Sequence, residues 1–212
     1  MKKSIYTLMM SLVICCLTAF QAYSMTPAQK QDVINKINTT ASGLKSMSCS
    51  FVQTKHLSLL SDKMVSKGNM YYSQPSKLRW EYTSPYTYLF VFNGTKVYVG
   101  NNSKKDVIDT NTNKVFKEVA RIMMNTVTGK ALSDTSDFTV NAEDAQASWK
   151  ITLVPKKKEM KQMFSKIEMF FNKSNNMISE LNVVEKNNDK TNIKFSDIST
   201  NKTLNANLFA IP

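Results

Sequence analysis

The sequence predicts a mainly β protein in which one N-terminal helix precedes a long series of short antiparallel strands. After Met47 the spacing of the apolar residues changes from about 3.6 to about 2, the change from a helix to half-buried strands. Alternating runs separated by turns containing Asn, Asp and Gly then continue to the end of the chain, interrupted by one helical segment. Such a meander tends to curl into a barrel or a strongly curved sheet, with two helices left to cover one face.

The composition narrows the possible chemistry. The chain has 212 residues, with 28 Lys and Arg against 16 Asp and Glu and a net charge of +12, and its length suits one domain. With one His, three Cys and five Gly, it has neither the usual residues of a metal cluster nor a phosphate-binding motif. His56 has no nucleophile or carboxylate motif beside it, and we expect it at a solvated strand end or loop. We therefore expect no enzyme, no metal and no cofactor.

Residues 1–24 have the features of a cleaved signal peptide. A basic start at Lys2-Lys3 precedes the apolar run Ile5–Phe20, and Ala22-Tyr23-Ser24 places small residues where signal peptidase reads them. The run is shorter than the roughly 20 residues that cross a bilayer. Cleavage would leave residues 25–212 as the mature, exported domain, and a retained N-terminal anchor is the alternative.

Cys15 and Cys16 raise the possibility of a lipid-modified N-terminus. A lipoprotein signal has a small residue just before its Cys, whereas Ile14 precedes Cys15, so we do not expect acylation. Removal of both residues leaves Cys49 without a partner for an intramolecular disulfide. We predict that Cys49 is a small buried apolar side chain.

Two segments combine helical spacing with helix end signals. Thr26-Pro27-Ala28-Gln29 has a capping Thr, a Pro in the first turn and a Gln three residues after the cap, and the helix should end at Gly43. The second helix spans Asn113–Val127 and should end at Gly129. The segment Lys156–Met163 is either a solvated loop or a short helix.

Strand spacing recurs in many short segments, and Leu78, Trp80 and Tyr82 show it best because they alternate with charged residues. The turn Asn93-Gly94 predicts a type I′ hairpin, in which both turn residues need a positive φ. The predicted strands are Met47–Phe51, Ser66–Tyr72, Leu78–Tyr82, Tyr88–Phe92, Lys96–Val99, Val107-Ile108, Phe138–Val140, Trp149–Leu153, Ile167–Phe171, Leu181–Val183 and Ile193–Phe195.

The lysine surplus indicates either contact with a negatively charged partner or, as the alternative, no more than a soluble surface. Proteins that bind single-stranded nucleic acid place aromatic residues among their basic ones. Here Phe51, Trp80, Tyr82 and Phe171 fall on the apolar, inward side of their strands, and an exported protein meets little nucleic acid. We therefore expect no nucleic-acid partner, and contact with anionic membrane surfaces or acidic proteins instead.

Several short motifs follow one another along the chain in a distinctive order. Ser50-Phe51-Val52-Gln53 is followed by Gly68-Asn69-Met70-Tyr71, then by Pro75-Ser76-Lys77-Leu78-Arg79-Trp80, and then by the Asn93-Gly94 hairpin. The chain closes on Ile193–Ile198 with a final Leu208-Phe209 and Pro212. This order resembles the LolA family of periplasmic outer-membrane lipoprotein carriers over nearly all of the mature chain.

The resemblance implies an unclosed antiparallel β-barrel with helices across its mouth and a hydrophobic cavity inside. It implies that the cargo is an acylated lipoprotein, that an inner-membrane ABC transporter donates it and that an outer-membrane acceptor receives it. It also implies that the protein is a monomer in the periplasm. Burying an acyl chain of about 16 carbons at roughly 0.8 kcal/mol per methylene contributes on the order of 10 kcal/mol.

The resemblance also implies which side chains line the cavity, and unbranched Met among them would adapt to varied chains. The strand positions that match the family are Phe51, Met70, Tyr72, Leu78, Trp80 and Tyr82. Alternation adds Val91, Val97, Ile151, Met169 and Phe171. The lid helix would contribute Phe116, Ile122 and Met123.

One position departs from the family pattern. An Arg commonly precedes the Pro of the P-x-x-x-x-W strand and latches the lid, whereas this chain has Gln74, which cannot form the same charge-assisted bond. The alternative is that the protein is a related open-barrel protein that accepts or senses lipoproteins and does not carry them. An acylated acceptor would need a lipid-modified Cys, and a sensor would normally carry a tether or second domain.

Overall fold

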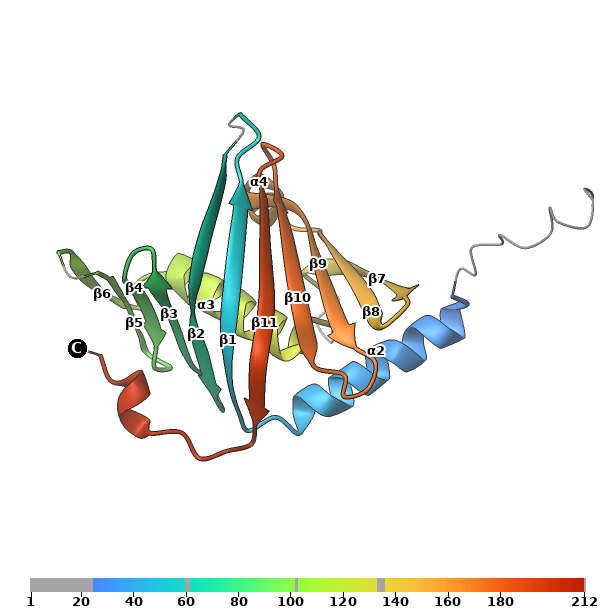
Figure 1. Ribbon diagram of the computed structural model, residues 1–212, viewed down its shortest axis with the longest axis horizontal. Coiled ribbons are helices and arrows are strands. Elements are labelled where there is room, and N and C mark those ends of the chain that lie inside the picture. Colours follow the sequence, from blue (N-terminus) through green and yellow to red (C-terminus); the bar gives the residue numbers. More distant parts are fainter. Residues whose placement is uncertain (1–24, 60–61, 102, 133–135, 212) are drawn as a thin grey trace, which may run out of the picture.

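The computed structural model describes residues 25–59, 62–101, 103–132 and 136–211, in which eleven strands form one antiparallel sheet (Figure 1). The predicted signal peptide, residues 1–24, lies outside the described residues. No helix in the described part of the chain is long and apolar enough to cross a bilayer.

The predicted helices and strands are all present, and the segment left open forms a short helix. The helices are α2 (Pro27–Ser42), α3 (Lys114–Thr128) and α4 (Lys158–Met163), with 3₁₀ helices η1 (Lys130–Leu132) and η2 (Ala206–Phe209). The strands are β1 (Ser46–His56), β2 (Lys63–Ser73), β3 (Lys77–Ser84), β4 (Tyr88–Phe92), β5 (Lys96–Gly100), β6 (Lys105–Asp109), β7 (Phe138–Ala145), β8 (Ser148–Pro155), β9 (Phe164–Asn172), β10 (Ile178–Glu185) and β11 (Lys190–Thr200).

The strand order is β6-β5-β4-β3-β2-β1-β11-β10-β9-β8-β7. Two runs of hairpin-connected strands therefore meet at β1 and β11, which pair antiparallel although they come from opposite ends of the chain. Strands β6 and β7 are the two edges of the sheet, so the predicted unclosed barrel is confirmed.

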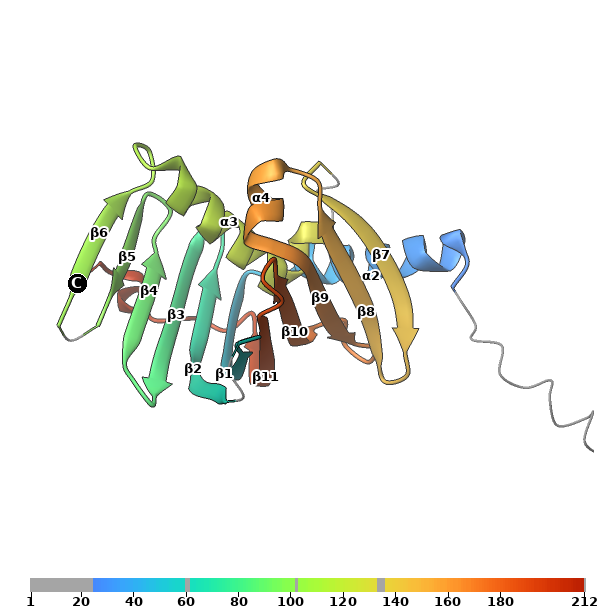
Figure 2. The ribbon, with the colours of Figure 1, turned by 90° about the horizontal axis from the view of Figure 1, so that it is seen from above.

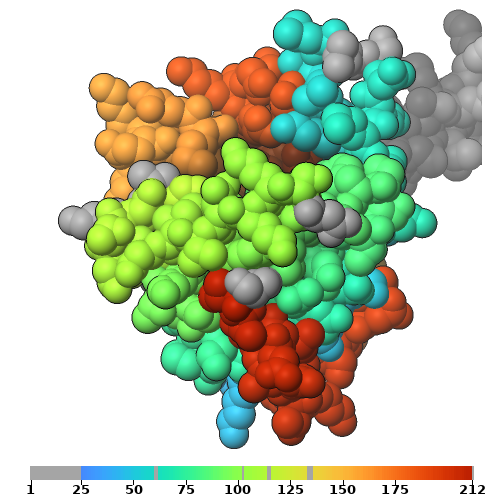
Figure 3. Space-filling model, turned by 90° about the vertical axis from the view of Figure 1, so that its left-hand side faces the viewer, coloured from blue at the N-terminus to red at the C-terminus, as the bar shows by residue number. Residues whose placement is uncertain are grey.

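Helix α3 joins these two edges, because it follows β6 and precedes β7. A chain that leaves one edge of a curved sheet must cross a face of the sheet to reach the other. The 15-residue helix is long enough to span about 22 Å at roughly 1.5 Å per residue. It lies across the concave side of the sheet (Figure 2). Figure 3 looks onto the side of the molecule where the edge strand β6 lies, the strand from which the chain passes into α3.

The helix ends follow the sequence signals. The Thr26 side chain accepts a hydrogen bond from the Gln29 backbone N–H at 3.3 Å, and the Gln29 side chain accepts from the Thr26 N–H at 2.8 Å. At the end of α3, Gly129 has the left-handed φ of 83°. A Cβ at this position would lie 2.9 Å from Ile37 Cγ2, so Gly129 also permits α3 to approach α2 closely.

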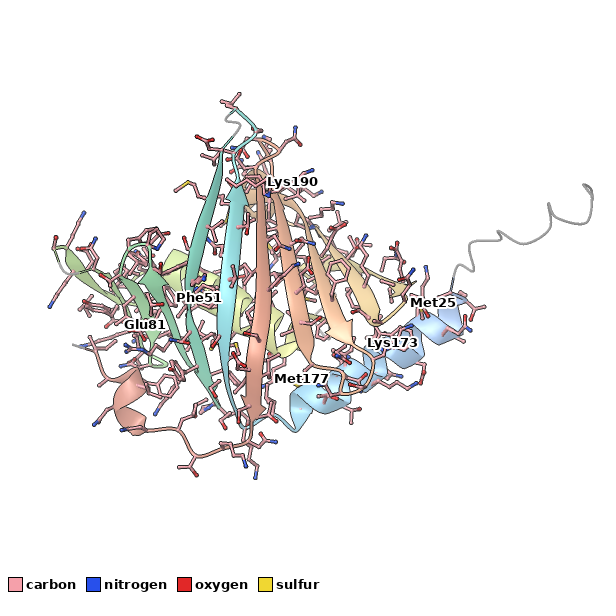
Figure 4. The ribbon with its side chains drawn as sticks, viewed as in Figure 1. Met25, Phe51, Glu81, Lys173, Met177 and Lys190 are labelled. Carbon is pink, nitrogen blue, oxygen red and sulfur yellow. The ribbon has the colours of Figure 1, made fainter. Side chains whose placement is uncertain are left out.

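The sheet register brings the aromatic residues of β1 and β3 together over one glycine. Phe51 pairs across from Gly68 of β2, and Gly68 pairs across from Tyr82 of β3. The centroid of the Phe51 ring lies 4.6 Å from that of Trp80 and 5.3 Å from that of Tyr82, to which the Phe51 ring is edge-on. Phe51 lies near the middle of the sheet (Figure 4) and is almost completely buried. This cluster forms one wall of the interior.

The hairpin between β4 and β5 is present, but its predicted turn type is wrong. Only Gly94 of the Asn93-Gly94 pair has a positive φ, of 106°, whereas a type I′ turn needs two. The Asn93 side chain instead accepts hydrogen bonds from the Thr95 and Lys96 backbone N–H groups, at 3.1 and 2.9 Å. An Asx-type turn therefore makes this connection.

Candidate functional site: an apolar cavity beneath helix α3

A cavity of about 370 Å³ lies between α3 and the inward face of the sheet. Its wall combines side chains from α3, from the end of α4 and from six strands. The lining residues are Gln53, Trp80, Tyr82, Tyr88, Phe90, Val119, Ile122, Met123, Thr126, Val127, Met163, Phe164, Ile167, Leu181, Val183 and Ile193. None of them is charged, so the cavity suits an uncharged, mainly apolar ligand.

Some of the residues predicted for the cavity and lid line it, and others pack beside it. Trp80, Tyr82, Ile122 and Met123 are in the wall. A second group belongs to the buried core on the same inward face and supports the wall from below: Phe51, Met70, Tyr72, Leu78, Val97, Ile151, Met169 and Phe171. Phe116 of α3 packs against this core and does not line the cavity.

Val91 is on the wrong face for the predicted role. It pairs with Arg79 of β3, whereas Phe90 pairs with Trp80 and lines the cavity in its place. Across the β4–β5 hairpin, Phe92 pairs with Val97. Since Val97 points inward, Phe92 and Phe90 do so too, and Val91 must point outward. There it lies beside Arg79, whose guanidinium donates to the Leu208 carbonyl near the C-terminus at 3.3 Å.

Several lining residues were not predicted, because their elements carry weak or ambiguous signals. On α3 the helical spacing of Val119, Ile122, Met123 and Thr126 could have identified one face. Met163 ends α4, is more than half exposed and reaches the cavity mouth. The strands β10 and β11 contribute Leu181, Val183 and Ile193, which follow the same alternation as the predicted strands but were not assigned to the cavity.

The few polar groups of the cavity are arranged on β1, β3 and α3. The Tyr82 hydroxyl donates to Gln53 Oε1 at 2.9 Å, and burial raises the pKa of Tyr82, so the phenol stays protonated. The Trp80 indole nitrogen is buried near that hydroxyl but makes no aligned hydrogen bond within the described residues. The Thr126 hydroxyl is likewise buried and unpaired there.

A buried carboxylate fastens α3 to the far half of the sheet. Asp137, next to the start of β7, has a side chain that is only 2% exposed. It accepts a hydrogen bond from the Arg121 guanidinium of α3, and its Oδ1 lies 2.5 Å from Lys157 Nζ at the start of α4. Arg121 also donates to Glu118 at 3.0 and 2.5 Å. This Arg121–Asp137–Lys157 cluster joins α3, β7 and α4.

The cluster is ionised at neutral pH. Burial by itself would raise the pKa of Asp137, but hydrogen bonds from Lys157 and Arg121 outweigh it and hold the pKa below its usual range. The hydrogen bond that Lys157 donates to Asp137 raises the pKa of Lys157 in turn. No local sequence signal marks this cluster, because Asp137 lies in an ordinary polar turn.

A second contact holds the C-terminal end of α3. Lys130, in the first position of η1, donates to the Tyr72 hydroxyl at 3.2 Å and lies 5.7 Å from the centre of the Tyr72 ring. The Gln74 side chain, two residues farther along, makes no hydrogen bond to α3 in the described parts of the chain. Lys130 therefore attaches the segment that follows α3 to β2, two residues before Gln74.

His56 and Cys49 are not among the residues that line the cavity. His56 ends β1 and pairs with Lys190, which lies at the upper end of β11 (Figure 4). Cys49 is buried, and burial raises its pKa to about 12. Among residues that the structure describes, no group of His, Cys, Asp and Glu could hold a metal ion.

The curved, unclosed sheet and its covered apolar cavity define the class of open β-barrels with an internal cavity. The chain belongs to the LolA family, since the family model for "Outer membrane lipoprotein carrier protein LolA" matches residues 42–212. An outer-membrane lipoprotein carrier protein of Francisella tularensis subsp. novicida is 27% identical over 193 residues, covering 91% of this chain and 87% of its own. The protein of the same name from Francisella philomiragia is 30% identical over 189 residues, covering 88% and 85%.

Solved structures share the fold at low sequence identity. An uncharacterized conserved protein from Thermus thermophilus has a TM-score of 0.53 at 10% identity, covering 86% of this chain and 93% of its own. The MucA/MucB complex of Pseudomonas aeruginosa contains a chain with a TM-score of 0.50 at 10% identity, covering 85% of this chain and 61% of its own. These likenesses show the fold alone.

Proposed function

We propose that this protein carries lipoproteins through the periplasm and holds their acyl chains in the cavity beneath α3. The observation that carries the proposal is the cavity itself, which is about 370 Å³ in volume and is lined by aromatic and aliphatic side chains with no charge among them. The names of the relatives and the family membership support a carrier role.

The energetics agree with a carrier. Each methylene moved from water into the cavity contributes about 0.8 kcal/mol, so one long acyl chain contributes on the order of 10 kcal/mol. The volume lies near the lower end of the roughly 300 to 1,000 Å³ of ordinary ligand pockets. A cargo with several chains therefore requires α3 to move outward and enlarge the cavity.

Helix α3 is the part of the wall that moves in this proposal. It lies over the concave face without joining the sheet, and side-chain contacts fasten it at two places: Arg121 to Asp137 in its middle and Lys130 to Tyr72 beyond its end. Breaking these contacts opens the cavity while the hydrogen bonds of the sheet stay intact. The adaptable Met123 and Met163 at the wall suit chains of different length.

The direction of transport follows the family role. An inner-membrane ABC transporter supplies the acylated lipoprotein, and an outer-membrane acceptor receives it. Residues 1–24 act as the export signal, and residues 25–212 form the carrier domain, a monomer. Removing Lys2 and Lys3 with the signal leaves a strongly basic domain, which favours contact with anionic membrane surfaces and acidic partners.

The decisive experiment measures release of lipoproteins from inner-membrane spheroplasts. Added protein should release lipoproteins into the medium as one-to-one complexes, and binding of a fluorescent fatty-acyl probe should be displaced by the cargo. The proposal is wrong if the purified protein neither binds the probe nor releases lipoproteins.

A further inference from the structure

We infer that the cavity recognises the uncharged ester or amide carbonyl of an acyl group, with the Trp80 indole N–H as the principal donor. The inference rests on the proposed function, because it names the polar group that accompanies the acyl chain. It separates acyl esters and amides from two ligands with the same chains: free fatty acids and alkyl ethers.

The first support is an unpaired donor inside an apolar wall. The Trp80 side chain lines the cavity and is only 4% exposed. Its buried nitrogen lies near the Tyr82 hydroxyl but makes no aligned hydrogen bond in the described chain. An indole nitrogen can only donate, and a buried donor without a partner costs about 1 to 3 kcal/mol. A ligand oxygen that accepts from Trp80 Nε1 removes this cost.

The neighbouring polar groups also offer donors. Gln53 uses Oε1 to accept from Tyr82, which leaves its amide NH₂ group without a protein partner in the part of the chain described. The buried Thr126 hydroxyl on α3 is unpaired as well, and it lines the cavity from the opposite side. The cavity therefore supplies donors from both the sheet and the helix, and the matching ligand group is an acceptor.

The charge of the wall defines the kind of acceptor. No Lys or Arg lines the cavity, so an ionised carboxylate would be buried without a counter-charge. An ether oxygen is uncharged but is a weaker acceptor than a carbonyl. A neutral acyl carbonyl meets both conditions, and it occurs where an acyl chain is linked to glycerol or to an amine.

The test compares three ligands with one eight-carbon chain each by calorimetry: monooctanoylglycerol, its mono-O-octyl ether analogue and octanoate at neutral pH. The wild-type protein should bind the ester about tenfold more tightly than the ether, equivalent to about 1.4 kcal/mol. Octanoate should bind more weakly than either of the glycerol lipids. An ester-to-ether ratio near one, or octanoate binding as tightly as the ester, overturns the inference without using any variant.

Variants then assign the donor. Trp80→Phe keeps an aromatic ring but removes the N–H, so the ester-to-ether ratio should fall to about one. The smaller ring lowers the affinity for both lipids alike, and the ratio cancels this loss. Trp149→Phe is the matched control, because the Trp149 nitrogen is also buried and unpaired in the described chain but Trp149 does not line the cavity. Its ratio should equal that of the wild type.

The outcomes separate this inference from the proposed function. If both glycerol lipids bind with equal affinity, the cavity is a lipid site and Trp80 is no carbonyl donor. If neither binds, and the fatty-acyl probe fails too, the proposed function is wrong and the inference falls with it. A Trp80→Phe ratio unchanged from the wild type assigns the discrimination to other groups and contradicts the role of Trp80.

Discussion

The ring of Phe51 lies over the backbone of Gly68, where any other residue at position 68 would carry its side chain. A Cβ at this position would lie 2.6 Å from Phe51 Cζ and 1.9 Å from the Glu81 carbonyl oxygen. The register between β2 and β3 shifts by one residue between Lys67, which pairs with Ser84, and Gly68, which pairs with Tyr82. This close approach permits the aromatic cluster that backs the cavity.

Gly68→Ala should therefore be strongly destabilising. The added methyl group meets backbone as well as a ring, so the strands must move apart, and we expect a loss of about 3 kcal/mol in the free energy of unfolding. Urea denaturation followed by far-UV circular dichroism measures it. Gly43→Ala is the control, because Gly43 has a φ of −78° and its Cβ would only make ordinary contacts at 3.7 Å. A loss similar to that of the control would contradict the steric explanation.

Asp137→Asn should loosen α3. The variant leaves Arg121 and Lys157 without their shared negative charge, and we expect a loss of about 1 to 3 kcal/mol in stability. Hydrogen exchange in α3 should accelerate more than exchange in β1 and β11, which hydrogen–deuterium exchange mass spectrometry resolves. Asp144→Asn is the matched control, because Asp144 pairs with Lys173 at the surface. Equal acceleration across the whole chain would show that Asp137 stabilises the fold without fastening α3.

The free energy of unfolding should fall as the pH is lowered into the acid range. The lowered pKa of Asp137 means that its contribution is complete above its unfolded pKa of about 3.9 and is lost as the pH falls through the lower folded value. Glu168 contributes in the same direction. Burial by itself would raise the pKa of Glu168, but hydrogen bonds from Lys166 and Lys150 outweigh that effect and lower the pKa. We expect level stability from about pH 8 to about pH 5 and a decline below about pH 4.

The Asp137→Asn variant checks the assignment, because it lacks the titrating carboxyl. Its free energy of unfolding should decline less than that of the wild type as the pH is lowered, so the two curves converge in acid. Parallel curves would show that Asp137 is not the ionised partner of Arg121.

Neighbouring valines on β10 test the cavity wall. Val183 lines the cavity, whereas Val184 points to the other face and pairs across from Lys190 and Lys166. Val183→Asp should weaken binding of a fatty-acyl probe by at least about tenfold, since it buries a charge among apolar side chains. Val184→Asp should leave binding within about twofold of the wild type, because lysines flank it. Similar losses in both variants would place the probe elsewhere.

Much of the fold could be predicted because its signals are local. The capping box of α2, the glycine that ends α3 and the alternation of Leu78 and Trp80 against charged residues are properties of neighbouring residues. The prediction of which residues face the cavity failed where a strand has no alternation of apolar and polar residues. In Tyr88–Phe92 every residue is apolar, so the inward face is decided by pairing with β3, which places Phe90 beside Trp80.

The sequence by itself determined the elements, their approximate ends and the apolar, uncharged character of the interior, because these depend on the period of the side chains and on turn chemistry. Only the tertiary structure decided which side chains surround the cavity. The pairing of β1 with β11 sets the two edges far apart, and α3 must cross the concave face to join them. That crossing brings Asp137 to Arg121 and places Thr126 in the cavity wall with Trp80, because long-range packing, which no local pattern records, sets these distances.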